Sequence, residues 1–566
     1  MSLELRVSAA VLILFGVCVC APAVAGAAWQ VNGTPVCTAP GLQFSPAAFS
    51  DGAHGAVVSW VDGPDLQWRI FCQRVDSAGG TVWGAGGTEV LSLGEWNFYH
   101  VNSDGRGGLL CGFECWGPTP SNPNATDICA KRVTSAGALE AWQAACTDTS
   151  EQHYSWVCPR QLGYYVDAYA VWNDHRDGEN RGYLQKYLSG NALCGNGLLV
   201  GGYPGADLLS VMMAFASEDD AAIMAWNDTR NGDSDVFAQC VLPWSESGIW
   251  GEYGTPVFEG AGTQTLLKLV TDGNYGAIAL WSDASKYVFA QRLDLSGWKA
   301  WGDNGDTISS SGNAGRGQLI FDGKNGGIFS WREGASPGPY TLRVQRIDAT
   351  GAKLWGSGGV VVESGSAGQV QQITTDEARG VIIAWTELTG GSYVIRAQRV
   401  DSLGSAVWTP GGVTVRSLPS YSSSPYIVSD GNHGAIMVWE DDRNGAGDIY
   451  AARIAADGST VGVGEGTGSA PFVNRIEGNV PNPFNPMTTI EFTLRDAGSV
   501  RLCVYDISGR LVRVLKQGLL DAGRHEVVWD GTDGDGDQVA SGVYVCRLEG
   551  PRVSDGTQSR KIVVVR

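Results

Sequence analysis

Carboxylates crowd one short segment near the C-terminus of this 566-residue chain. Residues 530–537 read Asp-Gly-Thr-Asp-Gly-Asp-Gly-Asp, and a calcium ion prefers about six to eight oxygen ligands, to which several carboxylates contribute. The spacing departs from the EF-hand rule, because no glutamate stands at its last ligand position. Asp and Gly are also typical of a solvated hairpin turn. The sequence therefore predicts such a turn, and the alternative is a calcium site formed by Asp530, Asp533, Asp535 and Asp537.

A second constellation of charged residues recurs three times along the chain. An aspartate stands two residues after a tryptophan and is followed by arginine and a glycine turn, in Asp174–Gly178, Asp228–Gly232 and Asp441–Gly445. A ring of Asp–Arg pairs displayed on one face would be a functional arrangement. A catalytic site, however, needs different residues that converge once, whereas these copies are alike. We therefore expect each aspartate to cap its turn and to hold the arginine as part of the architecture.

Signatures of an enzyme are absent from the sequence. The six histidines are scattered, and no Gly-x-Ser-x-Gly elbow stands on a strand-to-helix turn with suitable partners. Cys111 and Cys115 are close in sequence, but no histidine pair follows them, so zinc is not expected. The sequence predicts no catalytic residue and, apart from the calcium alternative, no cofactor. Distant carboxylates can still meet as a glycosidase pair, which keeps a carbohydrate-active enzyme as an alternative.

The N-terminus carries the features of a signal peptide, which we assign to residues 1–25. Arg6 supplies a positive charge, Val7–Ala21 is apolar, and Ala23-Val-Ala25 is a small-x-small cleavage site. A helix rises about 1.5 Å per residue, so the apolar run is too short to cross ~30 Å of hydrocarbon. We expect export, and no transmembrane segment in the mature chain.

Cysteine usage bears on the redox compartment. Two of the 13 cysteines, Cys18 and Cys20, lie within the signal peptide and leave an odd number in the mature chain. In an oxidising compartment some of these pair, and at least one thiol is left over. Cys503 and Cys546 fall in one small C-terminal segment. They either form a bridge across facing strands or pack as two buried thiols.

One pattern recurs from about residue 44 to residue 456. Each copy has an Asp-Gly turn, an apolar run that ends in tryptophan, a strand containing Gln-Arg, and in most copies a second tryptophan before Gly-Gly. The copies follow one another every ~54 residues, close to the ~40–50-residue period of propeller blades. The first tryptophan position is occupied by Trp60, Phe113, Trp172, Trp226, Trp281, Trp331, Trp385 and Trp439. We expect the Gln-Arg pairs and the tryptophans to be architectural.

Each copy offers four strand candidates rich in Val, Ile, Tyr and Trp. In the seventh copy these are Val370–Thr374, Val381–Trp385, Tyr393–Val400 and Val413–Val415. No long run of helical period competes with them. We predict an all-β fold in which residues 29–460 form an eight-bladed β-propeller. A seven-bladed ring is the alternative, because the second and third copies are irregular.

The two ends of the repeat region predict how the ring closes. The last copy lacks its second tryptophan, and a segment that matches this missing part of the repeat lies at the mature N-terminus. There Trp29–Val36 matches Trp250–Val257 of the fourth copy. We expect the N-terminal strand to complete the final blade, which removes exposed sheet edges.

The amino-acid composition limits the classes of molecule that the protein is expected to bind. The chain has 79 glycines, 21 tryptophans and a net charge of −20. A phosphate backbone requires a cationic surface, so nucleic acid is not expected as a partner. Residues 472–566 contain 12 basic and 12 acidic residues. The negative charge therefore belongs to the propeller.

The last 95 residues form a separate module behind a Gly-rich linker, residues 461–471. Ile490–Leu494 and Val500–Val504 alternate apolar and other residues, as half-buried strands of a sandwich do. The ordered motifs of this module are Asn479-Val-Pro-Asn-Pro-Phe-Asn-Pro486, Val504-Tyr-Asp-Ile-Ser-Gly-Arg510, Trp529-Asp-Gly531 and Ser541-Gly-Val-Tyr544.

With these motifs, residues 472–566 resemble the C-terminal sorting domain of type IX secretion substrates and the related immunoglobulin-like domain of flagellar hook-capping proteins. The resemblance implies a small immunoglobulin-like β-sandwich. It also implies passage across the outer membrane of a Gram-negative bacterium, with the secretion machinery as a partner.

Together these features predict an extracellular or surface-located, non-enzymatic propeller that binds a protein or a glycan. The alternatives are an extracellular carbohydrate-active enzyme with its site at the propeller mouth, and a structural surface protein. We expect specificity to lie in the irregular segments Trp116–Asp127 and Asp148–Tyr165, because function collects on loops of a rigid scaffold.

Overall fold

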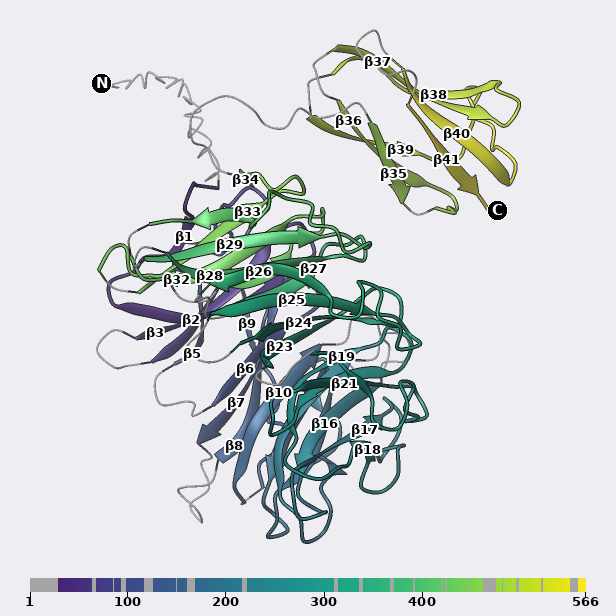
Figure 1. Ribbon diagram of the computed structural model, residues 1–566. Coiled ribbons are helices and arrows are strands. Elements are labelled where there is room, and N and C mark those ends of the chain that lie inside the picture. The colour runs from purple at the N-terminus through teal and green to yellow at the C-terminus, as the bar shows by residue number, and fades with distance from the viewer. Residues whose placement is uncertain are drawn as a thin grey trace, which may run out of the picture. The chain divides into compact units, whose positions relative to one another are not determined.

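The computed structural model is all-β: every helix or strand assigned in the described residues is a strand. The chain divides into two compact units, Met1–Gly464 and Glu465–Arg566, and Figure 1 draws both. No helix in the part of the chain that the structure describes is long and apolar enough to span a membrane. The structure describes residues 29–565 except 64–67, 85, 93–97, 117–125, 149, 160–167, 216–220, 310–313, 335–338, 367–370, 390–391, 419, 423–424, 446, 462–474, 481, 495–497, 521–522 and 550–557.

The described strands of the first unit form eight antiparallel sheets, which we number in chain order. Sheet 1 consists of β2 (Leu42–Ser50), β3 (Ala56–Gly63), β4 (Arg69–Val75) and β5 (Thr88–Leu91), and sheet 2 of β6 (Tyr99–Ser103), β7 (Leu109–Trp116), β8 (Thr126–Val133) and β9 (Leu139–Ala141). Sheet 3 consists of β10 (Gln152–Pro159), β11 (Ala168–Asp174) and β12 (Arg181–Leu188), with β13 (Asn191–Ala192) and β14 (Leu198–Gly201) both paired with β12. Sheet 4 consists of β15 (Leu208–Phe215), β16 (Ala222–Asp228), β17 (Asp235–Val241) and β18 (Thr255–Phe258).

Sheets 5 to 8 continue the same order. Sheet 5 consists of β19 (Thr265–Thr271), β20 (Ala277–Ser282), β21 (Val288–Leu293) and β22 (Asp306–Thr307), and sheet 6 of β23 (Ala314–Phe321), β24 (Gly327–Glu333), β25 (Tyr340–Ile347) and β26 (Val360–Ser366). Sheet 7 consists of β27 (Gln371–Thr375), β28 (Val381–Thr389), β29 (Ser392–Val400) and β30 (Val413–Arg416). Sheet 8 consists of β31 (Tyr426–Ser429), β32 (Ala435–Asp441) and β33 (Asp448–Ile454), with β34 (Thr460–Val461) and β1 (Thr34–Cys37) both paired with β33.

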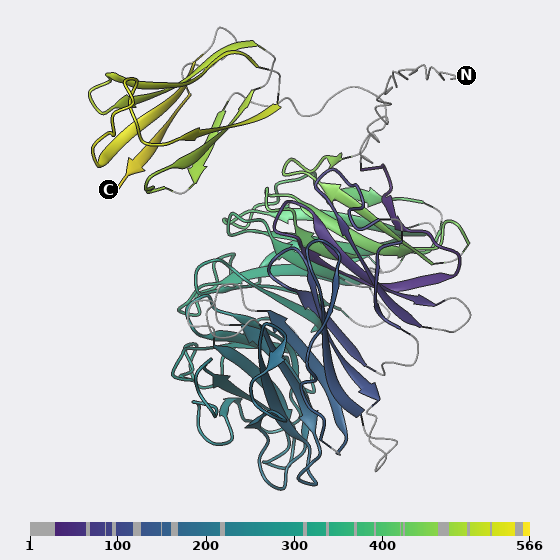
Figure 2. The ribbon, with the colours of Figure 1, turned by 180° about the vertical axis from the view of Figure 1, so that it is seen from behind.

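The first strands of successive sheets lie side by side, which makes the first unit propeller-like. β2 lies beside β6, β6 beside β10, and the series continues through β15, β19, β23 and β27 to β31, which again lies beside β2. The N-terminal β1 pairs antiparallel with β33, with Thr34 opposite Ala451. Figure 1 shows the purple β1 next to the green β33, and the view from behind in Figure 2 shows the same neighbours.

The strands arise where the sequence predicts them. In sheet 7 all four predicted strands are present, as β27 to β30. The hairpin between β27 and β28 is closed by Asp376, whose Oδ1 accepts hydrogen bonds from Ala378 N and Gly380 N. Gly380 is required there, because a Cβ would lie 2.3 Å from the carbonyl oxygen of Val400. The turn chemistry therefore fixes the register of the two strands.

The core of the first unit is divided among the joints between neighbouring sheets. The first tryptophan of the repeat is buried in each sheet that has one, and Trp281 and Trp331 are fully inaccessible. Phe113 takes the same place in sheet 2. Because each apolar side chain is buried against the adjacent sheet, every sheet depends on its neighbours for a core.

The second unit is a β-sandwich. One sheet pairs β35 (Arg475–Val480), β36 (Thr488–Leu494) and β39 (Gly523–Trp529); the other pairs β38 (Leu511–Leu520), β37 (Gly498–Asp506), β40 (Gly542–Glu549) and β41 (Gln558–Val564). A single core lies between the two sheets and includes Phe492, Leu502 and Trp529. Two antiparallel sheets around one core are the arrangement expected of an immunoglobulin-like domain.

The cysteines resolve one alternative that the sequence left open. Cys503 and Cys546 lie on the paired strands β37 and β40 but are buried free thiols. In the register Val504 lies opposite Cys546, so the two cysteines are one residue out of step and project to opposite faces of the sheet. The disulfide of the described residues joins Cys115 on β7 to Cys129 on β8.

Candidate functional site

Six aspartates at the hairpins between first and second strands serve the architecture. In sheet 1, Asp51 Oδ1 accepts hydrogen bonds from Ala53 N and Gly55 N, and Asp51 Oδ2 accepts one of 2.9 Å from Arg74 Nε on the third strand. A carboxylate with both oxygens engaged is a structural tie. The corresponding pairs are Asp104–Arg132, Asp272–Arg292, Asp322–Arg346, Asp376–Arg399 and Asp430–Arg453.

The glutamine before the arginine is also structural. Gln73 donates from Nε2 to Gly84 O and accepts at Oε1 from Arg74 N and Trp83 N. It thereby fixes the turn that carries the second tryptophan of the repeat. The same role is taken by Gln239, Gln291, Gln345 and Gln398, and Gln185 fixes the corresponding turn that carries Cys194.

The second tryptophan ties most sheets to the next one, in an arrangement that we call the Trp–carbonyl clamp. In sheet 7, Trp408 Nε1 donates to Ala456 O of sheet 8 at 3.0 Å, and Arg399 Nη1 donates to the same oxygen. One carbonyl thus receives two donors across the joint. The clamps of the described residues are Trp29–Ser77, Trp83–Ser135, Trp250–Leu295, Trp301–Ala349, Trp355–Ser402 and Trp408–Ala456.

The three Asp-x-Arg segments have the predicted architectural geometry. Asp174 accepts hydrogen bonds from Trp172 Nε1 at 3.0 Å and from the side chain of Arg176, whose backbone N–H also bonds the carboxylate. Burial opposes ionisation of Asp174, but the hydrogen bonds from Arg176 and Trp172 outweigh it and lower its pKa. The Arg176 guanidinium stacks on the Tyr183 ring at 3.9 Å. Asp228 and Asp441 hold Arg230 and Arg443 in the same way.

The joint between sheets 3 and 4 is closed differently. Cys194 stands where most sheets have the second tryptophan, and its backbone N–H binds Gln185 Oε1. Lys186 replaces the repeated arginine, and its ammonium donates to three backbone oxygens of sheet 4, those of Leu242, Pro243 and Ser245. A lysine therefore substitutes for the clamp at this joint.

At the joint between sheets 2 and 3 the clamp is broken. Trp142 is half-buried, and among the described residues its indole N–H has no hydrogen-bond partner. The hairpin of sheet 3 that faces it is a tight turn at Ser189 and Gly190, with φ of 51° and 78°. Arg132 Nη1 likewise turns to Glu140 at 3.4 Å rather than to a carbonyl of the next sheet. The shorter turn therefore leaves both donors without their usual acceptor.

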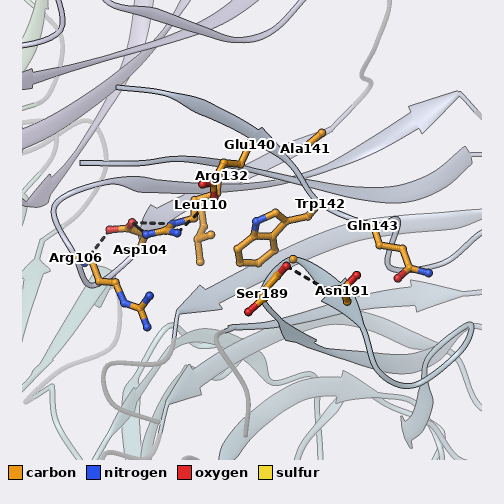
Figure 3. A pocket seen from close by; sticks show the side chains of 11 residues that line it. Asp104, Arg106, Leu110, Arg132, Glu140, Ala141, Trp142, Gln143, Ser189 and Asn191 are labelled. Carbon is orange, nitrogen blue, oxygen red and sulfur yellow. Dashed lines mark hydrogen bonds and ion pairs between the residues drawn. The ribbon is translucent and has the colours of Figure 1, made fainter. Parts of the chain in front are cut away.

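A pocket of about 530 Å³ opens at this joint. Figure 3 shows Trp142 between the Asp104–Arg132 pair and the Ser189–Asn191 hairpin. Gly190 packs against the edge of the indole, since a Cβ there would lie 2.8 Å from Trp142 Cδ1. The polar side chains on the wall are those of Asp104, Arg106, Arg132, Glu140, Gln143, Ser189 and Asn191. The pocket combines one aromatic ring with several polar groups, as binding sites for small ligands do.

The carboxylates of the pocket are held by arginine. Asp104 Oδ2 accepts from Arg132 Nε and Nη2, and Asp104 Oδ1 accepts from the backbone of Arg106 and Gly108. Glu140 is ion-paired with Arg132 at 3.4 Å. The formal charges of Asp104, Glu140, Arg106 and Arg132 cancel. The pocket therefore suits an uncharged polar ligand.

Sequence reasoning located the irregular copies but not this pocket. Residues 117–125 of the segment Trp116–Asp127, and residues 149 and 160–165 of the segment Asp148–Tyr165, lie outside the described residues. The described ends of the first segment include Thr126 and Asp127, which are buried on β8. The described part of the second segment contains β10, in which Gln152 and Val157 are buried. The signal for the pocket was the one-residue shortening of the β12–β13 turn opposite Trp142.

The acidic segment of the second unit forms a turn. Asp533 Oδ1 accepts from Asp535 N and Asp537 N, while Asp530 Oδ1 accepts from the backbone N–H and hydroxyl of Thr532. The hydroxyl of Thr532 is the main cause that lowers the pKa of Asp530. No group of three or more His, Cys, Asp or Glu residues within the described ranges is arranged to hold a metal ion.

Comparisons with known proteins give one family match. None of the curated proteins matches the sequence. Among solved structures, the BP39L lectin from Burkholderia pseudomallei is similar at 11% identity over 66% of this chain and 99% of its own, with a TM-score of 0.41. The polysaccharide lyase Uly1 is similar at 11% identity over 78% of this chain and 94% of its own, with a TM-score of 0.39.

PorZ, a surface component of the type-IX secretion system of Porphyromonas gingivalis, is similar at 10% identity over 95% of this chain and 99% of its own, with a TM-score of 0.18. The family model of the FlgD Ig-like domain matches residues 486–551. That match lies inside the second unit and agrees with its sandwich of two sheets. The C-terminal part of the chain is therefore an immunoglobulin-like domain of the FlgD type.

Proposed function

We propose that this protein is a secreted or surface-displayed, non-enzymatic binding protein, in which a propeller holds the ligand and the C-terminal domain serves export. The observation that carries the proposal is the pocket beside Trp142. It opens at a joint where the repeat departs from its own pattern, whereas the repeated charged pairs elsewhere close hairpins and joints. A rigid scaffold with a polar pocket at an irregular joint is the arrangement of a binding protein.

The scaffold in this proposal is a closed ring of eight blades that the N-terminal strand completes. Three contacts support it, and two of them join the first copy of the repeat to the last copy. Trp29 Nε1 and Arg453 Nη1 both donate to Ser77 O, and His54 Nδ1 lies 2.8 Å from Asp430 O. Together with the β1–β33 pairing, these contacts repeat at the ends what the clamps do at the other joints.

The state of the carboxylates in the pocket supports the proposal of binding rather than catalysis. Hydrolysis of a glycosidic bond requires one carboxyl group as an acid and a second as a base or nucleophile. Asp104 has both oxygens engaged by donors, and Glu140 is paired with Arg132. The pocket thus presents acceptors for hydrogen bonds rather than a free acid–base pair.

The experiment is to incubate the purified mature chain with bacterial surfaces, proteins and polysaccharides, and to measure both retention and release of products. We expect saturable retention without new reducing ends or unsaturated sugars. Release of such products in proportion to the protein added would overturn the non-enzymatic role and favour the carbohydrate-active enzyme.

We further propose that residues 472–566 direct the chain across the outer membrane of a Gram-negative bacterium through its secretion machinery. The resemblance of the motifs and the match to an Ig-like family support this part. The test is cell fractionation of the full-length chain and of a variant that ends at residue 471. We expect the truncated chain to stay in the periplasm, and unchanged delivery to the surface would exclude a sorting role.

A further inference from the structure

We infer that the pocket at the joint between sheets 2 and 3 binds a neutral saccharide, with one sugar ring stacked on Trp142. The inference rests on the proposed binding function and names the class of ligand. It starts from the contrast between Trp142 and the tryptophans at equivalent places. Trp250, Trp301, Trp355 and Trp408 are about 95% buried and clamped, whereas Trp142 lines an open pocket.

The indole supplies the flat partner that a sugar ring requires. A tryptophan offers an apolar face together with one polar N–H. The face fits the C–H groups of a pyranose, and the N–H is a donor for a hydroxyl. The Tyr187 ring packs against the indole, with ring centroids 5.1 Å apart, and Gly190 packs against the five-membered ring of the indole. The platform is therefore held in place without the clamp.

The rim supplies both donors and acceptors. Gln143 Oε1 accepts from Ala192 N, which leaves its amide N–H₂ open among the described residues. Asn191 donates its side-chain N–H₂ to backbone oxygens of its own turn. Its side-chain oxygen therefore accepts no hydrogen bond from the described residues. Glu140 offers its second carboxylate oxygen. Sugar hydroxyls donate and accept at once, so this mixture matches them better than it matches a purely anionic or cationic group.

Charge selects a neutral saccharide over a charged one. Two acidic and two basic side chains line the pocket and cancel. Among the described residues the two arginines of the pocket are matched in number by two carboxylates, so the pocket carries no net positive charge to attract a uronate or sulfate. The chain also carries a net charge of −20, which repels polyanions. The described lining likewise has no net negative charge to attract an amino sugar. A volume of about 530 Å³ lies within the ~300–1,000 Å³ range of small-ligand sites.

The test is a glycan array of neutral, uronate-containing, sulfated and amino glycans, probed with the mature chain and four variants. We expect binding to neutral glycans, and Trp142→Ala to weaken it about tenfold, as loss of one stacking contact does. Trp142→Phe keeps a ring and retains most of the binding. Asn191→Ala weakens binding about threefold, on the scale of one hydrogen bond. The control is Trp244→Ala, which removes a tryptophan that is 62% exposed on sheet 4 outside the pocket.

Near-ultraviolet circular dichroism and melting of each variant establish that it is folded. If Trp142→Ala does not fold, Asn191→Ala decides the matter, because neutral binding that this variant leaves unchanged overturns the inference. Neutral binding that survives Trp142→Ala unchanged, binding confined to charged glycans, or an array without any neutral hit overturns the inference. A blank array with retained binding to proteins or cells leaves the proposed function standing. Product release, in contrast, defeats the non-enzymatic role itself.

Discussion

Aspartates in the first unit differ in what they hold, although their sequence contexts look alike. Asp441 is a strongly constrained example, because its Oδ2 accepts from Arg443 at 2.6 Å, from Trp439 at 2.9 Å and from Arg416 at 3.0 Å. Both Asp441 and Arg416 are fully buried. Burial opposes ionisation, but the three donors outweigh it and hold the pKa of Asp441 well below its usual range.

Replacing Asp441 with Asn is expected to lower the free energy of unfolding at neutral pH by about 3–5 kcal/mol, since it leaves the buried Arg416 without its charge partner. A carboxylate with a lowered pKa in the folded state stabilises above the unfolded pKa of ~3.9, and this contribution is lost as pH falls further. The difference between wild type and Asp441→Asn should therefore shrink below about pH 4. Urea unfolding between pH 7 and pH 3 measures it.

The control for this prediction is Asp530→Asn, whose carboxylate is 54% exposed. Its effect on stability is expected to stay within about 0.5 kcal/mol. An equally large loss in both variants, or a gap for Asp441→Asn that does not depend on pH, would contradict the assignment to a buried ion pair.

At the scale of elements, the Trp–carbonyl clamp explains how most neighbouring sheets are joined. Trp355→Phe removes the indole N–H that donates to Ser402 O but keeps an aromatic ring. We expect it to lower the free energy of unfolding by about 1 kcal/mol, the usual value of one hydrogen bond. Trp142→Phe is the matched control, because the same atoms are removed where no clamp exists. Denaturant unfolding of both variants measures the difference, and equal losses would mean that the clamp contributes nothing.

Much of this element-level architecture could be predicted from the sequence. The roles of Asp174 and Gln73 followed from turn chemistry that recurs at fixed positions. The pocket could not be predicted in this way, since it depends on two sheets at once. Trp142 loses its acceptor because a turn in the next sheet is shorter. The sequence of a single copy of the repeat does not show which backbone carbonyl of the neighbouring copy faces its tryptophan.

For the whole molecule, the repeat period and the strand-forming runs predicted an all-β, propeller-like unit and a separate sandwich. The positions of the sheets around the unit were beyond the sequence, because contacts between first strands depend on packing rather than on local preference. The likeness of Trp29–Val36 to Trp250–Val257 did predict a long-range pairing, and β1 does pair with β33. A sequence similarity between two short segments can thus predict a pairing between distant strands when both segments occupy the same position in the repeat.

Deleting residues 29–37 is expected to lower the melting temperature of the first unit and to promote aggregation. The deletion removes Trp29, Val36 and Cys37 from the core and leaves Ile449–Ala451 of β33 without their partner strand. Thermal unfolding and light scattering of the full mature chain and of the deletion variant measure both effects. The substitution Val31→Ala, at an exposed position of the same segment, is the control. Unchanged melting and solubility would show that the N-terminal strand is dispensable.

The pairing of β1 with β33 also sets the order of events during biogenesis. The first segment of the described chain must wait for one of the last segments of its unit before either is complete, so an interrupted chain has β1 without a partner. Contacts so distant in sequence form slowly. A chain that has lost its N-terminus presents the opposite defect on β33. Either defect exposes backbone hydrogen-bonding groups, so a quality-control protease or chaperone that recognises open strands can separate finished molecules from fragments without reading any sequence.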